Sequence, residues 1–245
     1  MVGRSDSRTV GRWRRCWMMF GGAALLSVSP TVRPSDAQVG YEPGHSPFHD
    51  IPRGAVWVFT GGYVAGERGQ LGVGMANGPS AGLRYEARLA GAVGVSLGIT
   101  YAHTTRFLID VNKDTASRKT GPFNSGVVLT DAALQLVLTG NKTWRGLAPY
   151  IGAGIGLAIG SGSPPDTVYH FRTTITLAPN VGVRWYPARR LSVRTDFRAV
   201  AWKLRYPLTY RVPYSPDGIP VLPSTVSLDD WTWHPWLTIG VGWIF

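Results

Sequence analysis

Charged side chains of both signs recur at every second residue in segments that are otherwise small or apolar. Because side chains alternate across an extended strand, residues two apart lie on one face of it. Opposite charges that share an enclosed face can form a network of salt bridges, provided that each charge finds a partner. The predicted network consists of Arg84, Glu86, Arg88, Asp131, Arg184, Arg194, Asp196 and Arg198.

Two pairs of residues have spacings that could support other chemistry. His103 and Thr105 lie two apart, so a general base and a hydroxyl nucleophile could share one strand face. No acidic residue can be assigned to orient the histidine, which favours a histidine at the membrane edge over a hydrolase. His45 and His49 are four apart beside Asp50, but without a helix or a third fixed ligand a flexible tail is the favoured interpretation. We therefore expect no catalytic residue, no metal and no cofactor.

Alternating segments supply the strands that would position these residues. In residues 93–105, large apolar side chains occupy odd positions and small or polar ones occupy even positions. This period predicts a strand whose two faces meet different surroundings. A strand tilted by ~45° needs about 9 to 11 residues to cross a bilayer, and the segments reach that length. The predicted strands are residues 54–66, 79–90, 93–105, 127–140, 147–160, 171–186, 191–206 and 236–245. The facing of the first strand stays open, with a preference for Trp57, Phe59 and Tyr63 outside.

Short and long connections alternate strictly between these segments. The short ones lie near 90–92, 140–146 and 187–190, and the long ones near 66–78, 108–126, 161–170 and 207–235. This pattern is typical of an all-β fold, an eight-stranded antiparallel transmembrane up-and-down β-barrel, with tight periplasmic turns and long extracellular loops. An even strand number places both termini on the periplasmic side. We expect no internal hydrophobic core of the kind found in soluble proteins.

An eight-stranded barrel is only wide enough for side chains to fill its interior. Charges inside and apolar residues outside exclude a soluble lipid-carrying barrel, which has the reverse arrangement. We expect the predicted network to pair across the lumen and block it. Exchange of an arginine between Glu86 and Asp131 or Asp196 could open a narrow path, but a static network is the favoured hypothesis.

The amino terminus has the organisation of a secretory signal peptide. Five arginines precede an apolar stretch over residues 16–28, and Ser35-Asp36-Ala37 offers a cleavage site. The stretch is too short for a membrane-spanning helix. We predict a signal peptide over residues 1–37, a periplasmic lead-in over 38–53 and an outer-membrane β-barrel over 54–245.

The charge of the chain bears on its partners. The full sequence has 25 Lys and Arg against 14 Asp and Glu, and residues 1–37 hold six of the former and two of the latter. The remaining 19 basic and 12 acidic residues give the predicted mature chain a net charge of +7 and no cysteine. The basic residues are scattered rather than grouped with stacking aromatics, which argues against a nucleic-acid partner. Anionic lipopolysaccharide is the more natural partner.

The last predicted loop, between Tyr206 and Pro235, is the best candidate for an extracellular interaction surface. Five prolines stiffen it, and aromatic side chains on a stiff loop can stack on sugars or hold a partner. The surface residues are Tyr210, Tyr214, Trp231 and Trp233. The favoured alternative is that Trp231, Trp233 and Trp236 form the outer aromatic belt of the membrane, with Trp144, Trp185, Tyr186 and Trp243 in the periplasmic belt.

The last nine residues alternate strictly and are mostly apolar. They resemble the C-terminal signature of bacterial outer-membrane β-barrels, in which the positions of Trp243 and Phe245 are read by the assembly machinery. Residues 149–156, 181–197 and 243–245 are similar to the OmpA-like and OmpX-like group of small outer-membrane barrels. The resemblance covers residues 54–245. It implies outer-membrane lipid, lipopolysaccharide and the assembly machinery as partners. The chain ends at the barrel, so the peptidoglycan-binding role of longer OmpA-type proteins is not expected.

Three functional hypotheses follow. The favoured one is a non-enzymatic barrel with an envelope or surface-interaction role through its long loops. The second is a narrow channel or transporter for small or hydrophobic solutes, similar to the OmpW-like group. The third is a lipid A-modifying enzyme, since small deacylases of the outer membrane place a histidine and a serine two apart on such a face. The third would require His103, with Thr105 in the place of the serine.

Overall fold

The computed structural model describes residues 46–162 and 169–245. The predicted signal peptide, its cleavage site and His45 lie outside the described residues. The described chain is all-β apart from one short 3-10 helix, η1 (Leu208–Arg211). No helix among the described residues is long and apolar enough to cross a membrane. The strands are β1 (Phe48–Asp50), β2 (Val56–Val64), β3 (Gly78–Ala90), β4 (Val93–Ile109), β5 (Lys119–Val137), β6 (Lys142–Trp144), β7 (Leu147–Ser161), β8 (Thr174–Ala188), β9 (Leu191–Arg205) and β10 (Asp229–Ile244).

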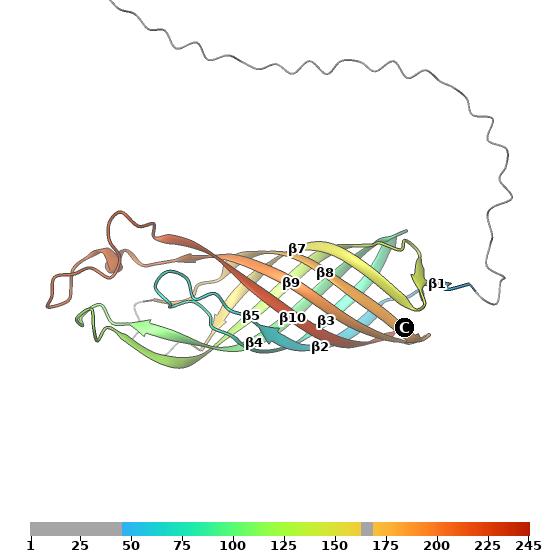
Figure 1. Ribbon diagram of the computed structural model, residues 1–245, viewed down its shortest axis with the longest axis horizontal. Helices are drawn as coiled ribbons and strands as arrows, with labels where there is room; N and C mark the ends of the chain where they lie inside the picture. Colours follow the sequence, from blue (N-terminus) through green and yellow to red (C-terminus); the bar gives the residue numbers. More distant parts are fainter. Residues whose placement is uncertain (1–45, 163–168) are drawn as a thin grey trace, which may run out of the picture. The chain divides into compact units, whose positions relative to one another are not determined.

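Eight long strands close into an antiparallel barrel (Figure 1). Each pairs with the next along the chain, and β10 pairs with β2, for example Trp243 opposite Trp57. The short strands β1 and β6 pair with each other, and β6 continues onto β7 at one end. The predicted eight-stranded up-and-down barrel is confirmed. Closure gives each long strand two neighbours through the middle of the cylinder, so no sheet edge is exposed there.

Connections of two lengths define the two ends of the barrel. Residues 91–92, 138–146 and 189–190 connect strands at the turn end, where β1 and β6 also lie. Residues 65–77, 110–118, 162–173 and 206–228 connect strands at the loop end. The terms turn half and loop half below refer to the parts of the interior next to these ends.

The alternation of each strand separates an apolar outer wall from a mixed interior. On β4, Leu97, Ile99 and Tyr101 are exposed on the outside, whereas Ser96 and Thr100 are buried inside. On β2 the aromatics Trp57, Phe59 and Tyr63 point outward and the valines inward, as preferred from the sequence. Soluble monomers rarely expose so much contiguous apolar surface, whereas a barrel surrounded by lipid does.

Three strands extend further toward the loop end than the sequence predicts. β4 and β5 pair as far as Ile109 opposite Lys119, which leaves a connection of residues 110–118 only. β10 begins at Asp229 and pairs with β9 as far as Arg205. Pro235 concealed this extension, because proline lacks the N–H that an interior strand requires. Pro235 fits here because β2 ends opposite Trp236, so β10 has no neighbouring strand on that side at Pro235.

These longer strands correct the interpretation of the last loop. Trp231 and Trp233 lie on β10 with exposed side chains, not in a loop. Trp236 was placed in the outer belt but is buried inside, because its even position belongs to the opposite face of β10. Tyr210 was expected on the surface, yet η1 turns it inward until it is fully buried. Tyr214 alone of the four stays exposed outside a strand.

The expectation of a barrel without a hydrophobic core is wrong for the loop half. Its strands present apolar side chains to the interior, and loop residues such as Val73, Met75 and Tyr210 fold back over them. The loops thus bury apolar surface that would otherwise face water. The hydrophobic cluster consists of Val64, Val73, Met75, Ala102, Ile109, Val111, Val127, Leu129, Ala158, Tyr169, Ala178, Val200, Trp202, Leu204, Tyr206, Tyr210, Leu222 and Trp236.

Candidate functional site

The turn half of the interior holds a layer of paired charges, beginning with Asp131 on β5. Arg84 on β3 donates to both of its carboxylate oxygens, at 2.9 and 2.8 Å. Arg198 on β9 donates to it at 3.0 Å. One carboxylate thus connects guanidinium groups from strands that are not neighbours in the barrel, and the forked contact with Arg84 has the geometry of strong charge-assisted hydrogen bonds.

Asp196 on β9 is the most heavily engaged carboxylate. It accepts from Arg198 at 2.9 Å and from the hydroxyl of Tyr150 on β7 at 2.8 Å. Arg194 forms an ion pair with it at 3.0 Å. Asp196 is completely buried, so these three partners replace the water that an isolated carboxylate would need.

Glu86 on β3 connects the layer to β8 and β9. It accepts from Arg184 at 3.0 Å and contacts Arg194, and Arg184 also donates to Gln135. The ring of Tyr150 lies beneath two of the guanidinium groups, 4.4 Å from Arg184 and 5.2 Å from Arg194. Such cation–π contacts add to the ion pairs. The charged layer is defined as Arg84, Glu86, Asp131, Arg184, Arg194, Asp196 and Arg198.

Glycine provides the space that these large side chains occupy. A Cβ atom on Gly98 would lie 2.7 Å from an Arg84 nitrogen and 3.0 Å from an Asp131 oxygen. A Cβ atom on Gly182 would collide with the hydroxyl of Tyr150. The glycines of the inward faces therefore permit guanidinium groups and a phenol to cross a narrow lumen.

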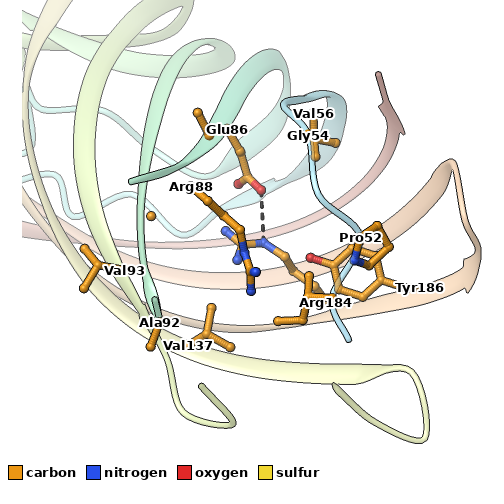
Figure 2. A pocket seen from close by; sticks show the side chains of 13 residues that line it. Pro52, Gly54, Val56, Glu86, Arg88, Ala92, Val93, Val137, Arg184 and Tyr186 are labelled. Atoms are coloured by element: carbon orange, nitrogen blue, oxygen red, sulfur yellow. Dashed lines mark hydrogen bonds and ion pairs between the residues drawn. The ribbon is translucent and has the colours of Figure 1, made fainter. Parts of the chain in front are cut away.

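Arg88 is the one member of the predicted network that has no salt bridge within the described part of the chain. It projects into a small pocket at the turn end, beside the Glu86–Arg184 pair (Figure 2). One of its terminal nitrogens is buried without a hydrogen-bond partner. Tyr186, Pro52 and Val137 also line this pocket.

The segment that precedes the barrel closes part of the turn end. Ile51 is buried against Val137, Ala148 and Tyr150. The expected flexible tail is instead paired over residues 48–50, with the backbone oxygen of His49 accepting from the Thr143 hydroxyl at 3.1 Å. Burial of Ile51 supplies the apolar contact that holds this segment in place.

Aromatic side chains fill the loop half. The Trp202 ring stacks on His234 at 3.7 Å between centroids and meets the edge of Phe171 at 5.9 Å. Tyr206 lies 6.2 Å from Tyr169 and 6.4 Å from Tyr210. Burial raises the pKa of Tyr169 to about 12. Burial likewise raises the pKa of Tyr210, and burial followed by the Asp230 carboxylate raises the pKa of Tyr206. These phenols stay neutral at physiological pH.

The connection of residues 65–77 is fastened to β10 by polar contacts. The Glu67 amide donates to Nδ1 of His234 at 3.1 Å, and the Glu67 carboxylate accepts from the Trp233 amide at 2.6 Å. The backbone N–H of Gln70 donates to the Asp230 carboxylate at 2.8 Å, and this carboxylate also accepts from the Tyr206 hydroxyl. Residues 72–76 are buried beneath this attachment, so the connection covers the loop half.

Arg106, buried on the inward face of β4, was missed by the sequence analysis as an interior residue. The signal was present, because Ser96, Thr100 and Arg106 share the same parity along the strand. The aromatic side chains of the remaining long connections, by contrast, follow no period that would have placed them inside.

The other candidate residues lie on the outside. His103 is exposed on the outer wall and Thr105 is half-buried, with no hydrogen bond between them among the described residues. Trp243 and Phe245 are exposed at the turn end. Within residues 46–162 and 169–245, no group of three or more His, Cys, Asp or Glu side chains could hold a metal ion.

Comparison with solved structures supports the fold. Neisserial surface protein A aligns with a TM-score of 0.51 and 16% identity, over 82% of this chain and 98% of that chain. Two crystal structures of Ail, the attachment invasion locus protein of Yersinia pestis, align with TM-scores of 0.40 and 0.39 at 18% and 16% identity, over 79% of this chain and 99% of theirs. The second of these is a complex with the heparin analogue sucrose octasulfate. No family model and no curated protein sequence matches this chain.

The closed order of the strands and the apolar outer wall together define the class of the molecule. It is an eight-stranded antiparallel barrel that is apolar outside and polar within its turn half. This is the fold of the small bacterial outer-membrane β-barrels.

Proposed function

We propose that the protein is a non-enzymatic, integral barrel of the bacterial outer membrane, with an envelope or surface-interaction role carried by its loop end. The observation that carries this proposal is the filling of the interior. Buried salt bridges occupy the turn half, and a hydrophobic cluster occupies the loop half. An interior filled in this way supports a role on the outer surface rather than transport through the lumen.

The outer wall has the dimensions that a membrane requires. On β10, exposed Trp231 and Trp233 stand near one end and Trp243 near the other, with aliphatic side chains between them. Ten residue steps from Trp233 to Trp243 at ~3.4 Å per residue span ~34 Å, or ~24 Å along the normal for a strand tilted by ~45°. This matches the apolar band of about 25 Å bounded by aromatic girdles in outer-membrane barrels.

The proposed orientation has the loop end outside the cell and both termini in the periplasm. In this orientation Tyr214 and its stiff connection face the surroundings, and lipopolysaccharide surrounds the loop half. Trp243 and Phe245 face the periplasm, where the assembly machinery would read them. The positive charge of the chain suits anionic head groups.

Cysteine labelling in intact cells tests the location and the orientation together. The predicted mature chain contains no cysteine, so Tyr214→Cys and the turn-end substitution Arg189→Cys each introduce a single thiol. A membrane-impermeant maleimide should label the first in intact cells and the second only after the outer membrane is permeabilised. Labelling of the turn end alone in intact cells would reverse the orientation. A folded monomer that needs no detergent would refute the membrane location.

The proposed absence of conduction has its own test. The refolded barrel in a planar lipid bilayer should show no stepwise conductance at ±100 mV, with a general porin in the same bilayer as positive control. Regular conductance steps would favour the narrow channel instead. A lipid A-modifying activity that disappears in His103→Ala would favour the enzyme, with His103 exposed on the outer wall as its candidate base.

A further inference from the structure

Arg106 is a buried cation for which the described part of the chain provides no counter-charge. Its side chain is 3% exposed, and none of its three guanidinium nitrogens has a hydrogen-bond acceptor. It has a favourable contact with the ring of Tyr169, which lies 6.0 Å from the guanidinium carbon. A cation–π contact at this distance offsets only part of the cost of removing a guanidinium from water.

The other unpartnered polar groups of the loop half bring no negative charge. The hydroxyl of Tyr210 is fully buried without a partner, and its pKa is raised chiefly by burial, while Arg106 is close enough to lower it. The indole nitrogens of Trp202 and Trp236, in the same hydrophobic cluster, are also buried without acceptors. Buried polar groups in native proteins almost always have partners, so these unmatched groups point to an acceptor that the described residues do not provide.

No carboxylate on the described strands is available to serve as that acceptor. Asp131, Asp196 and Glu86 are engaged by the arginines of the charged layer. Asp230 accepts from Tyr206 and from the Gln70 amide. Water could complete some of the hydrogen bonds, but it would not neutralise the charge.

We propose that the loop half of the interior is a binding site for a carboxylate with an apolar body, and that Arg106 and Tyr210 hold the carboxylate. A planar guanidinium fork matches the two oxygens of a carboxylate. The aromatic and aliphatic side chains of the hydrophobic cluster suit an apolar body. The hydrophobic cluster and the connection of residues 65–77 fill and close the loop half, so the ligand gains both entry and space when this connection moves away and the contacts of Glu67 and Gln70 with β10 open. The site is independent of any partner that binds the outer surface.

Three small probes separate the roles of charge and apolar body. The refolded barrel in nonionic detergent is titrated with sodium benzoate, with benzyl alcohol as a neutral analogue of similar size and with sodium acetate as a carboxylate without an apolar body. Binding is followed by calorimetry and by fluorine NMR of 5-fluorotryptophan at positions 202 and 236. Benzoate should bind saturably and shift both resonances, and each of the other two probes should bind at least about tenfold more weakly.

Matched arginine variants test the residue assignment. Arg106→Met keeps the length of the side chain and removes its charge, and it should weaken benzoate binding by about 10- to 100-fold. Arg172→Met removes an exposed arginine at the same end and should leave binding unchanged. Tyr210→Phe keeps the ring and should weaken benzoate but not benzyl alcohol. If Arg106→Met does not refold to a heat-modifiable barrel, Arg106→Lys and Tyr210→Phe carry the test. Absence of saturable benzoate binding up to about 50 mM, equal binding of benzyl alcohol, or unchanged binding in these variants would overturn the proposal.

Discussion

The two halves of the barrel interior follow the same side-chain alternation but are filled with different chemistry. In the turn half, three carboxylates join four arginines, and each carboxylate serves at least two of them. In the loop half, Arg106 lies over the ring of Tyr169 and has no carboxylate partner among the residues that the structure describes. Every arginine of the charged layer thus has a carboxylate partner within the chain, whereas Arg106 has none among the described residues.

This difference has a mechanical consequence. The charged layer connects β3, β5, β8 and β9 through side chains that have few alternative partners. The loop half depends on packing and on connections that fold back over it, held by a small number of polar contacts. We expect opening motions to begin at the connections of the loop half, because few hydrogen bonds attach them to the strands and weakly attached segments open at the lowest free energy.

The largest effect should follow from breaking the charged layer at Asp196. Asp196→Ala leaves Arg194 and Arg198 with fewer counter-charges in a buried site, which should lower the free energy of unfolding by about 3–5 kcal/mol. Urea-induced unfolding in lipid bilayers measures this change. The control is Asp229→Ala, which removes a half-exposed ion pair with Lys203 at 2.6 Å and should cost less than about 1 kcal/mol. Equal effects of the two variants would contradict a structural role for the layer.

A cavity in the hydrophobic cluster should lower the free energy of unfolding. Leu129→Ala removes a fully buried side chain on β5 and should cost about 2–4 kcal/mol in the same unfolding measurement. Leu134 lies on the same strand but faces outward, 59% exposed. Leu134→Ala should cost about 1–2 kcal/mol, because lipid fills the space and only the transfer of the side chain is lost. A larger loss at Leu134 than at Leu129 would mean that the cluster is loosely packed.

The barrel could be predicted from the sequence because its signal is local. Strict alternation in segments such as residues 93–105 fixes which side chains share a face, and alternating connection lengths fix the up-and-down order. The charged positions carry the same period. Their partners do not follow from it, because the contact of Glu86 with Arg194 joins strands that are not neighbours in the sheet. Such pairs depend on how far the strands are staggered around the ring.

The hydrophobic cluster was missed for two physical reasons. Tyr210 and Met75 lie in connections, where no side-chain period marks the inward direction. Trp236 lies on a strand whose parity was readable, but its aromatic type and its nearness to Trp233 suggested a membrane belt. The prediction for Trp236 followed the residue type rather than the alternation of the strand. The alternation determines which face a strand residue occupies.

Removal of the Arg106 charge should stabilise the barrel, whereas removal of a charge from the charged layer should destabilise it. Arg106→Met replaces a buried cation without a counter-ion by an apolar side chain of similar length, and it should raise the free energy of unfolding by about 2 kcal/mol in the absence of carboxylates. Arg84→Met is the comparison, because it leaves Asp131 short of a partner and should destabilise the barrel. Destabilisation by both substitutions would show that Arg106 is satisfied within the chain.

The smallest expected effect is a loss of stability at alkaline pH that arises from a buried tyrosine of the loop half. The pKa of Tyr169 is raised to about 12 by burial, from about 10 in the unfolded chain. Its contribution to stability is therefore complete below pH 10 and is lost as the pH rises toward 12, because the unfolded chain ionises first. The slope is on the order of 1 kcal/mol per pH unit. Tyr169→Phe should flatten this part of the unfolding profile, and Tyr214→Phe, at an exposed position, should leave it unchanged. An identical decline in all three proteins would place the phenol of Tyr169 in water rather than in the hydrophobic cluster.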